Sequence, residues 1–360
     1  MRRALGWGGV GLSLSLASAA LAEAPPGPRL AFLRSIERPA SLAIATSDAS
    51  LRAPAAVAGG GIQLRPLPYP ASGPAWSSDG SRIAFSGMRG PLPGILRPAR
   101  RQIYVVASDG AAMRAIPGTR GGFAPVFSPD GKSIAFAKTA TRAVHAPGPT
   151  DRPPWRSTTV WRVGLSGGGR PRRLTEWQNG VENLPSSFSP DGSVLAMTHR
   201  DSFRDRADAI ALRLDGRGSY LLADSASWPK HSPDGFRIAF LGIGRADGTS
   251  CCERGDGFSV DLYTMNADRS SPLRLTDTPG EAERAVSWDP SGERLVYTTK
   301  SPPTERASGD LEAAVMQVNS DGSCPTRFQV RVPRLRDYHL LLRYPTWQPG
   351  PGRDAGRIEC

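Results

Sequence analysis

The sequence contains few of the side chains that most often bind metal ions. Its 360 residues include four histidines and four cysteines. These residues are His145, His199, His231, His339, Cys251, Cys252, Cys324 and Cys360. They show no Cys-x-x-Cys or Cys/His spacing, which is the sequence signature of a zinc site. Because no phosphate-cradling glycine loop is present either, we expect neither a metal ion nor a cofactor.

Lysine is also scarce, because the basic residues are almost all arginine. Lysine occurs only at Lys132, Lys138, Lys230 and Lys300, whereas lysine and arginine together number 45 and the net charge is +12. A basic protein favours acidic partners such as anionic wall polymers, lipid headgroups or acidic proteins. No basic motif is interleaved with aromatic residues as in nucleic-acid-binding proteins, so we expect no nucleic-acid partner.

Long apolar runs are missing after the N-terminus, which argues against a later membrane-spanning helix. The N-terminus begins with Met1-Arg2-Arg3, continues with an apolar stretch and reaches small residues at Ala20-Leu21-Ala22. This is the layout of a secretory signal peptide with an Ala-x-Ala cleavage site. We therefore predict a signal peptide at residues 1–22 and a single domain at residues 23–360. We expect a periplasmic or secreted monomer without an integral membrane segment after cleavage.

One short phrase is abundant instead: an aromatic residue, Ser-Pro-Asp-Gly, two further residues and an apolar triplet. Complete or variant copies begin at Trp76, Phe127, Phe188, His231 and Trp288, and a truncated copy begins at Trp347. Proline, aspartate and glycine favour a tight turn, and the apolar flanks favour strands, so each copy predicts a hairpin. A second hairpin signature follows most copies. Recurrence every 40 to 60 residues, roughly, predicts a radial arrangement of four-stranded blades.

The two ends of the chain supply complementary parts of one more blade. The last copy provides one strand, and three N-terminal segments that begin near Arg29, Ser41 and Ser47 provide the others. Joining them closes the ring and pairs the open sheet edges. The sequence therefore predicts an all-β, six-bladed propeller in which residues 346–348 pair with residues 29–33. This topology places Cys324 and Cys360 toward one face on neighbouring blades, and we expect them to form a disulfide.

The aromatic-Ser-Pro-Asp-Gly and Ile-Ala-Phe pattern, complete at residues 127–136, resembles the repeat of the TolB-like (WD40-like) β-propellers. The resemblance covers nearly all of the chain after residue 28. It implies a propeller fold but no single function, because the repeat serves many purposes. TolB carries a separate α/β domain before its propeller. Here the residues before the first copy are already needed for strands, so the chain looks TolB-like without being the Tol–Pal component.

The connections between strands predict where a partner binds. If the strands of a blade are labelled A to D from the centre outward, short turns lie on one face and the longer B–C loops on the other. Long loops on a rigid scaffold commonly carry binding sites, and the planar arginine fork suits carboxylates and phosphates. We therefore expect an envelope protein or anionic polymer to bind the B–C loop face. The residues expected there are Arg97, Arg100, Arg101, Arg142, Arg152, Trp155 and Arg156.

Three functional hypotheses remain open. The first is a non-enzymatic, exported binding module that uses the B–C loop face. The second is a propeller-type enzyme, such as a glycosidase, lyase or lactonase, with residues that converge at the central channel. The third is a relative of the propeller that gates prolyl-peptidase catalytic domains, which would act with a separate partner chain.

Two features resemble catalytic groups but have structural interpretations. Residues 164–168 match the Gly-x-Ser-x-Gly nucleophile elbow around Ser166, yet that motif requires the strand-to-helix turn of an α/β-hydrolase. Other blades carry a Ser-Asp-Gly turn at this position, so we interpret it as a turn. The aspartates of the repeat recur in nearly every blade, which favours a structural role, and His231 is interpreted as a packing variant of the aromatic residue.

Overall fold

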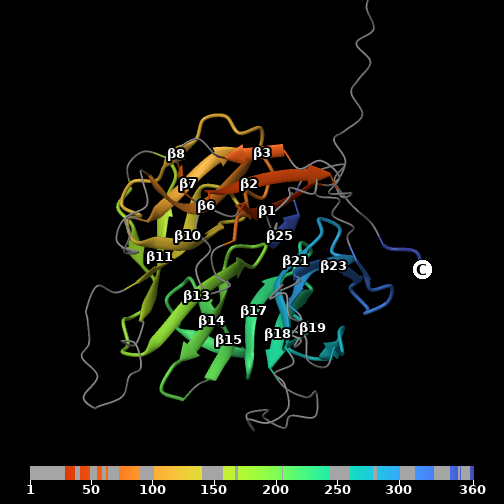
Figure 1. Ribbon diagram of the computed structural model, residues 1–360. Helices are drawn as coiled ribbons and strands as arrows, with labels where there is room; N and C mark the ends of the chain where they lie inside the picture. Colours follow the sequence, from red (N-terminus) through yellow and green to blue (C-terminus); the bar gives the residue numbers. More distant parts are fainter. Residues whose placement is uncertain are drawn as a thin grey trace, which may run out of the picture.

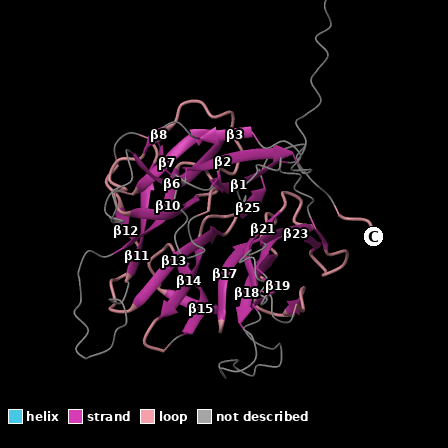
Figure 2. Ribbon diagram, viewed as in Figure 1, coloured by secondary structure: helices cyan, strands magenta, loops and turns pink. Residues whose placement is uncertain are grey.

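The structure is a computed structural model that describes the chain in segments. These are residues 29–36, 41–48, 55–58, 62–63, 73–89, 101–139, 157–166, 169–204, 206–243, 260–278, 282–300, 313–327, 341–347, 349 and 357–360. These segments consist of β-strands, turns and loops (Figure 2). No helix of theirs is long and apolar enough to cross a membrane.

Most strands pair antiparallel in groups of four, each ordered from an inner strand to an outer edge, and in two places a parallel pair joins neighbouring groups (Figure 1). We call each group a blade and name it after its inner strand. The blades are β5 (Ala75–Trp76) to β6 (Arg82–Arg89), β7 (Gln102–Ala107) and β8 (Arg114–Ala115); β9 (Gly122–Phe127) to β10 (Ser133–Thr139), β11 (Thr158–Gly164) and β12 (Arg172–Arg173); β13 (Val181–Phe188) to β14 (Val194–Asp201), β15 (Arg206–Arg213) and β16 (Ser219–Ala223); β17 (Ala226–His231) to β18 (Arg237–Ile243), β19 (Val260–Asn266) and β20 (Leu273–Arg274); and β21 (Ala282–Trp288) to β22 (Arg294–Lys300), β23 (Ala313–Asn319) and β24 (Thr326–Arg327). The short β4 (Ile62–Gln63) also pairs with β6.

The N-terminal and C-terminal strands form one blade together. β25 (Leu341–Trp347) pairs with β1 (Arg29–Ile36), which pairs with β2 (Ser41–Asp48) and then β3 (Ala55–Ala58). Leu30 lies opposite Trp347, and Ala31 lies opposite Thr346, which is the strand pairing that the sequence predicts. In Figure 1 the red end of the chain lies beside the blue end at this point. The indole Nε1 of Trp76 donates to the carbonyl oxygen of Thr346 at 3.0 Å, which ties this blade to the β5 blade.

The hydrophobic core lies between neighbouring blades. The first residue of each apolar triplet, such as Ile83, Ile134 or Leu195, is completely buried. Ala84 and Ile103 of the β5 blade pack in one cluster with Phe127 and other residues of the β9 blade. Burial of a large aliphatic side chain contributes about 1.5–3 kcal/mol. The repeated triplets therefore hold the blades together face to face.

Each inner strand from β9 to β25 contains an irregularity that the repeat pattern alone does not show. The strand register shifts near Ala124, Trp228 and Ala285, and these residues have φ angles of 51°, 59° and 56°. Similar shifts interrupt β13 and the pairing of β25 with β1. A β-bulge of this kind bends the strand and re-aims the side chains that follow. Proline follows the bulged residue in two of the strands, at Pro125 and Pro229, where a missing N–H is tolerated.

Candidate functional site

A cavity of about 740 Å³ lies between the inner strands, and we call it the central pocket. Residues of β5, β9, β13, β17, β21 and β25 line it, together with the turns that follow these strands. Prolines of those turns contribute to the wall: Pro129, Pro190, Pro233, Pro290 and Pro349. The pocket therefore extends from the bulges to the Ser-Pro-Asp-Gly turns.

The residue just before the repeat aromatic lines the central pocket in every inner strand, and we call these residues the ring positions. They are Ala75, Val126, Ser187, Lys230, Ser287 and Thr346. Three of them carry hydroxyl groups, and one carries a charge. The hydroxyls of Ser287 and Thr346 lie 3.3 Å apart. Sequence analysis missed this set, although its constant spacing from the aromatic was visible in the repeats.

Lys230 is the ring position with the most distinctive chemistry. Its Nζ donates to the carbonyl oxygen of Ser186 at 2.5 Å, and burial lowers the pKa of Lys230 to about 8. Its own carbonyl oxygen accepts a hydrogen bond from the Trp288 indole at 2.8 Å. The other ionisable residues that line the pocket in the described part of the chain are His231 and Asp289. Lys230 is thus a cation enclosed by mostly neutral walls.

An arginine stacks on the repeat aromatic at several blade junctions. The guanidinium of Arg237 lies 5.3 Å from the ring centre of Trp288 and donates to the carbonyl oxygen of Gly292 at 2.7 Å. Arg82 makes the same pair of contacts with Phe127 and Gly131. A cation over an aromatic ring is worth about 0.5–2 kcal/mol. These arginines, two positions after the turn glycine, therefore fasten one blade to the next.

The junction between the β13 and β17 blades departs from this arrangement. His231 replaces the aromatic residue, and Val194 occupies the position of the stacking arginine. The Ser187 hydroxyl lies 3.2 Å from His231 Nδ1 and accepts the His231 backbone N–H at 3.0 Å. Burial lowers the pKa of His231 to about 4, although the Asp191 carboxylate opposes the shift. The imidazole is therefore neutral near pH 7, in keeping with a packing role.

Ser187 and His231 also satisfy the distance criterion for a nucleophile and its base. However, the Ser187 hydroxyl can also donate to the carbonyl oxygen of Pro229 at 3.2 Å. Its single proton therefore has two possible acceptors, this oxygen and His231 Nδ1. A catalytic histidine is usually oriented by a third group on its other nitrogen. Among the described residues, no carboxylate bonds to the His231 ring. The contacts therefore resemble an inter-blade clasp more than a catalytic pair.

The repeated aspartates are engaged within their own turns. In the β9 blade the Ser128 hydroxyl donates to Asp130 at 2.5 Å, and the Lys132 backbone N–H donates to the same oxygen at 3.0 Å. These bonds lower the pKa of Asp130, and equivalent bonds lower the pKa of Asp191 to about 2. The glycine that ends the turn has a φ of 63° at Gly131, a conformation that suits glycine. These contacts agree with the structural role expected from the sequence.

The β21 blade keeps the same turn with its two polar residues exchanged. Asp289 stands where other copies have serine, and Ser291 stands where they have aspartate. The Ser291 hydroxyl donates to Asp289 at 2.7 Å, and the backbone N–H of Arg294 donates to the Asp289 carboxylate at 3.0 Å. Burial raises the pKa of Asp289. Asp289 lines the central pocket, but these bonds within its own turn leave its carboxylate little capacity to accept hydrogen bonds from a ligand.

The described part of the Ser166 motif lies at the end of β11 and in the bend that follows it. Ser166 is exposed just after β11, and the next strand is the short β12. The neighbouring Leu165 N–H donates to the carbonyl oxygen of Lys132 at 2.8 Å, which extends the ladder between β10 and β11. Within the described residues, β11 is followed by the strand β12, whereas a nucleophile elbow is followed by a helix.

The arginines predicted to bind a partner are mostly outside the described residues. These are Arg97, Arg100, Arg142, Arg152 and Arg156, with the accompanying Trp155. Arg101 is described, directly before β7, and only 9% of its surface is exposed. Its carbonyl oxygen accepts a hydrogen bond from Gly121 at 2.6 Å. Arg101 thus offers little area to a partner at the loop face.

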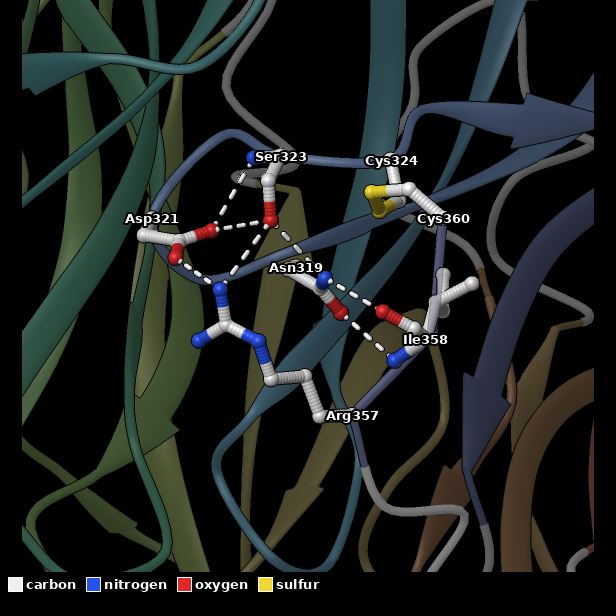
Figure 3. Close-up of a disulfide and its surroundings, with 7 residues drawn as sticks. All are labelled: Asn319, Asp321, Ser323, Cys324, Arg357, Ile358 and Cys360. Carbon is white, nitrogen blue, oxygen red and sulfur yellow. Dashed lines mark hydrogen bonds and ion pairs between the residues drawn. A yellow bond between two sulfur atoms is a disulfide. The ribbon is translucent and has the colours of Figure 1, made fainter.

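Cys324 and Cys360 form a disulfide with Cα atoms 5.4 Å apart (Figure 3). The neighbouring Asn319 side chain exchanges two hydrogen bonds with the backbone of Ile358, at 2.8 and 2.9 Å. Arg357 forms an ion pair with Asp321, which helps to lower the pKa of that carboxyl group. The sequence separation of 36 residues gives a loop-closure stabilisation of about 4 kcal/mol. The C-terminal residues are therefore clasped to the β23–β24 turn, whereas Cys251 and Cys252 lie outside the described residues.

A second buried acidic group lies at the start of β21. Glu283 is 1% exposed, accepts a hydrogen bond from the Thr278 hydroxyl at 2.6 Å, and has no described partner at Oε2. Burial, with the nearby Asp261 charge, raises the pKa of Glu283 to about 7. Asp261 itself pairs with Arg274 at 2.7 Å. Within the described segments, no three histidine, cysteine, aspartate or glutamate residues form a group that could hold a metal ion.

Comparison with known proteins identifies the fold. No protein-family model and no curated protein matches the chain. The chain is similar to the structure assigned as TolB from Agrobacterium tumefaciens, with 17% identity, a TM-score of 0.54 and coverage of 84% of this chain and 89% of that one. It is also similar to a chain of a nidogen/laminin complex, with 14% identity, a TM-score of 0.55 and coverage of 91% and 100%. The protein thus has a TolB-like β-propeller fold.

A third similar structure is longer than this chain. The match to hydrazine synthase from Kuenenia stuttgartiensis has 14% identity and a TM-score of 0.59, and it covers 93% of this chain but 48% of that one. The three proteins differ in function, and their identities are low. These similarities therefore describe the fold, and the function must be argued from the site.

Proposed function

We propose that this protein is an exported, non-enzymatic propeller of the cell envelope that binds a protein or polymer ligand in its central pocket. The leader-like N-terminus and the likeness to TolB support export to the envelope. The pairing of β1 with β25, and the bond from Trp76 to Thr346, support a closed ring of six blades. A closed ring would hold the pocket walls rigid, so that ligand binding costs little conformational entropy.

The composition of the pocket wall carries this proposal. Aromatic, proline and small apolar residues form much of the wall, and the polar groups among them are serine and threonine hydroxyls, His231, Asp289 and the Lys230 amine. A concave, largely apolar site with a small number of placed polar groups is typical of ligand binding. The volume of about 740 Å³ accommodates a short peptide segment or a few sugar units. A surface contact through the B–C loop arginines is the alternative site for the same function.

Capture of a partner from the cell envelope tests the proposal. Mature protein would be immobilised and incubated with a solubilised envelope fraction, and bound material would be identified by mass spectrometry. Ser287→Trp should fill the pocket and remove the captured partner, whereas the matched Ser166→Trp in an exposed turn should retain it. Capture that survives Ser287→Trp but is lost in the double variant Arg97→Glu and Arg100→Glu would move the site to the loop face.

A propeller-type enzyme is the second candidate, and the Ser187–His231 contact is the observation that favours it. Its test is hydrolysis of p-nitrophenyl acetate and of a panel of polysaccharides by the purified protein. The proposed binding role predicts no turnover above a heat-inactivated sample. Turnover that Ser187→Ala abolishes without lowering the melting temperature would establish the enzymatic function instead.

A further inference from the structure

We infer that the central pocket recognises a single carboxylate group, which is held by the Lys230 ammonium between the hydroxyls of Ser187 and Ser287. This inference rests on the proposed function, since it names the chemistry of the ligand that the pocket takes. A carboxylate of this kind occurs at the C-terminus of a peptide chain and on a small organic acid. The two sources share one recognition chemistry and are separated by the experiment below.

The first argument is the incomplete hydrogen bonding of Lys230. An ammonium group has three N–H donors, and within the described residues one of them is directed to the carbonyl oxygen of Ser186. Lys230 is half-buried, and a cation withdrawn from water is costly unless it is paired and hydrogen-bonded. Lys230 lines the central pocket, so an anion entering the pocket would supply acceptors that the described residues do not.

The second argument is the number of charges in the pocket. Among the described lining residues, His231 is neutral near pH 7 because burial lowers its pKa to about 4. Asp289 is engaged by Ser291 and by the backbone of its own turn. Lys230 therefore provides the one positive charge among the described lining residues, whereas Asp289 directs its carboxylate to its own turn. A ligand with one negative charge matches this single cation. A phosphate monoester carries about −1.5 to −2 at pH 7, so it would bring uncompensated charge into the pocket.

The third argument is the position of the hydroxyl groups. Lys230 lies on β17, and the equivalent ring positions of the preceding and following inner strands are Ser187 and Ser287. Among the described residues, the Ser287 hydroxyl makes long contacts of 3.3 Å, to the Trp288 carbonyl oxygen and the Thr346 hydroxyl. A hydroxyl in such weak contacts is available to donate to a carboxylate oxygen. The charged ring position is thus bordered on both sides by a hydroxyl.

The remaining wall defines what the carboxylate is attached to. Trp76, Val126 and Trp228 line the same pocket with apolar surface, which favours an apolar group near the carboxylate. The four tryptophans of the wall, Trp76, Trp228, Trp288 and Trp347, provide an intrinsic signal for binding. N-acetyl-leucine is therefore a suitable small ligand, and an N-acetylated hexapeptide ending in leucine is its chain-end counterpart.

The test compares each of these two compounds with its C-terminal amide, by tryptophan fluorescence and calorimetry on the mature protein. Wild-type protein should bind the free carboxylate at least tenfold more tightly than the amide. Lys230→Met should remove that preference, and Lys132→Met, which changes an exposed lysine in a turn, should retain it. Preference in the peptide pair alone identifies a chain end as the ligand, whereas preference in both pairs identifies the carboxylate of a small acid as sufficient.

A pH series gives the same answer without a substitution. The burial-lowered pKa of Lys230 is about 8, so the ammonium charge declines as pH rises through this value. The carboxylate preference of the wild-type protein should fall in that range, since N-acetyl-leucine and His231 are then already in their alkaline forms. Preference that persists unchanged to pH 10 would contradict the inference.

Failure of this inference differs from failure of the proposed function. Equal binding of acid and amide, lost in Ser287→Trp but unaffected by Lys230→Met, would show that the pocket binds ligands without reading a carboxylate. Wild-type protein that binds neither member of either pair would overturn the carboxylate inference, and the envelope-capture experiment would still decide the proposed function.

Discussion

Two neighbouring blade junctions solve the same packing problem in different ways. Between the β17 and β21 blades, the Trp288 ring is covered by Arg237 and its indole N–H reaches the Lys230 carbonyl oxygen. Between the β13 and β17 blades, His231 contacts the Ser187 hydroxyl, and Val194 replaces the arginine. At this junction both the aromatic ring and the arginine are therefore replaced, by His231 and Val194. Retaining the arginine beside a histidine would place two potential cations in contact.

The exchange has a consequence for the pocket. Lys230 immediately precedes His231, so the two side chains share the part of the pocket wall that β17 provides. A protonated histidine there would repel the ammonium group of Lys230. Burial keeps His231 neutral, so the β13–β17 junction presents one positive charge instead of two. We call the β17–β21 junction regular and the β13–β17 junction irregular. The regular junction contributes stability, and the irregular junction contributes the charged group of the pocket.

The largest expected difference between the two junctions is in the free energy of unfolding that is lost when the repeat aromatic, or the histidine in its place, is replaced by alanine. Trp288→Ala removes a large buried ring, its indole hydrogen bond and its cation–π contact, so we expect a loss of about 3–5 kcal/mol in the free energy of unfolding. His231→Ala removes a smaller ring with one side-chain contact, so the loss should be about 1–2 kcal/mol. Urea unfolding followed by circular dichroism measures both. Equal losses would contradict the division of roles between the junctions.

Acid should weaken the irregular junction selectively. The pKa of His231 is about 4 in the folded protein and about 6.5 in an unfolded chain, so between these values the unfolded state binds more protons. Stability therefore falls as pH drops from 6.5 to 4. Glu283 acts in the opposite direction, because its raised pKa of about 7 makes stability fall as pH rises from 4.5 to 7.

Comparison of wild-type protein with His231→Phe isolates the histidine contribution from that of Glu283. The difference in unfolding free energy between the two proteins should change as pH falls from 6.5 to 4, with wild type losing more. The groups described around the imidazole are Ser187, Lys230 and the Asp191 carboxylate. Parallel pH curves for the two proteins would mean that His231 does not titrate in this range.

Rebuilding the regular junction tests whether ring and cation form one unit. His231→Trp alone and Val194→Arg alone should each destabilise, because each lacks its partner and crowds a packed site. The double variant should recover about 1 kcal/mol relative to the sum of the two changes, as expected for a cation–π pair. A double-mutant cycle by urea unfolding measures this coupling, and additive effects would show that the two positions are independent.

The sequence alone predicts the junctions less well than the turns. The turn at Phe127–Gly131 and the pairing of β25 with β1 follow from local patterns, because turn residues and strand formers act over a few positions. The central pocket depends on bulges that decide which side chains face inward. In two strands their sequence signal is a proline two residues before the position of the repeat aromatic, at Pro125 and Pro229. This signal can be interpreted only once the strand register is known. The contact of Lys230 with Ser186 joins different blades and has no local signal.

The smallest expected effect concerns two serines at equivalent ring positions. Ser187 accepts the backbone N–H of His231 at 3.0 Å, so Ser187→Ala leaves a buried donor without its partner and should cost about 1 kcal/mol. Ser287 makes contacts of 3.3 Å only, so Ser287→Ala should change the free energy of unfolding by less than about 0.5 kcal/mol. For ligand binding we expect the opposite order. Ser287→Ala should weaken the affinity for N-acetyl-leucine more than Ser187→Ala does, because the Ser287 hydroxyl has the weaker contacts within the protein and is free to donate to the carboxylate. Measuring unfolding and N-acetyl-leucine affinity in both variants therefore separates the serine that fastens the β13–β17 junction from the serine that serves the pocket.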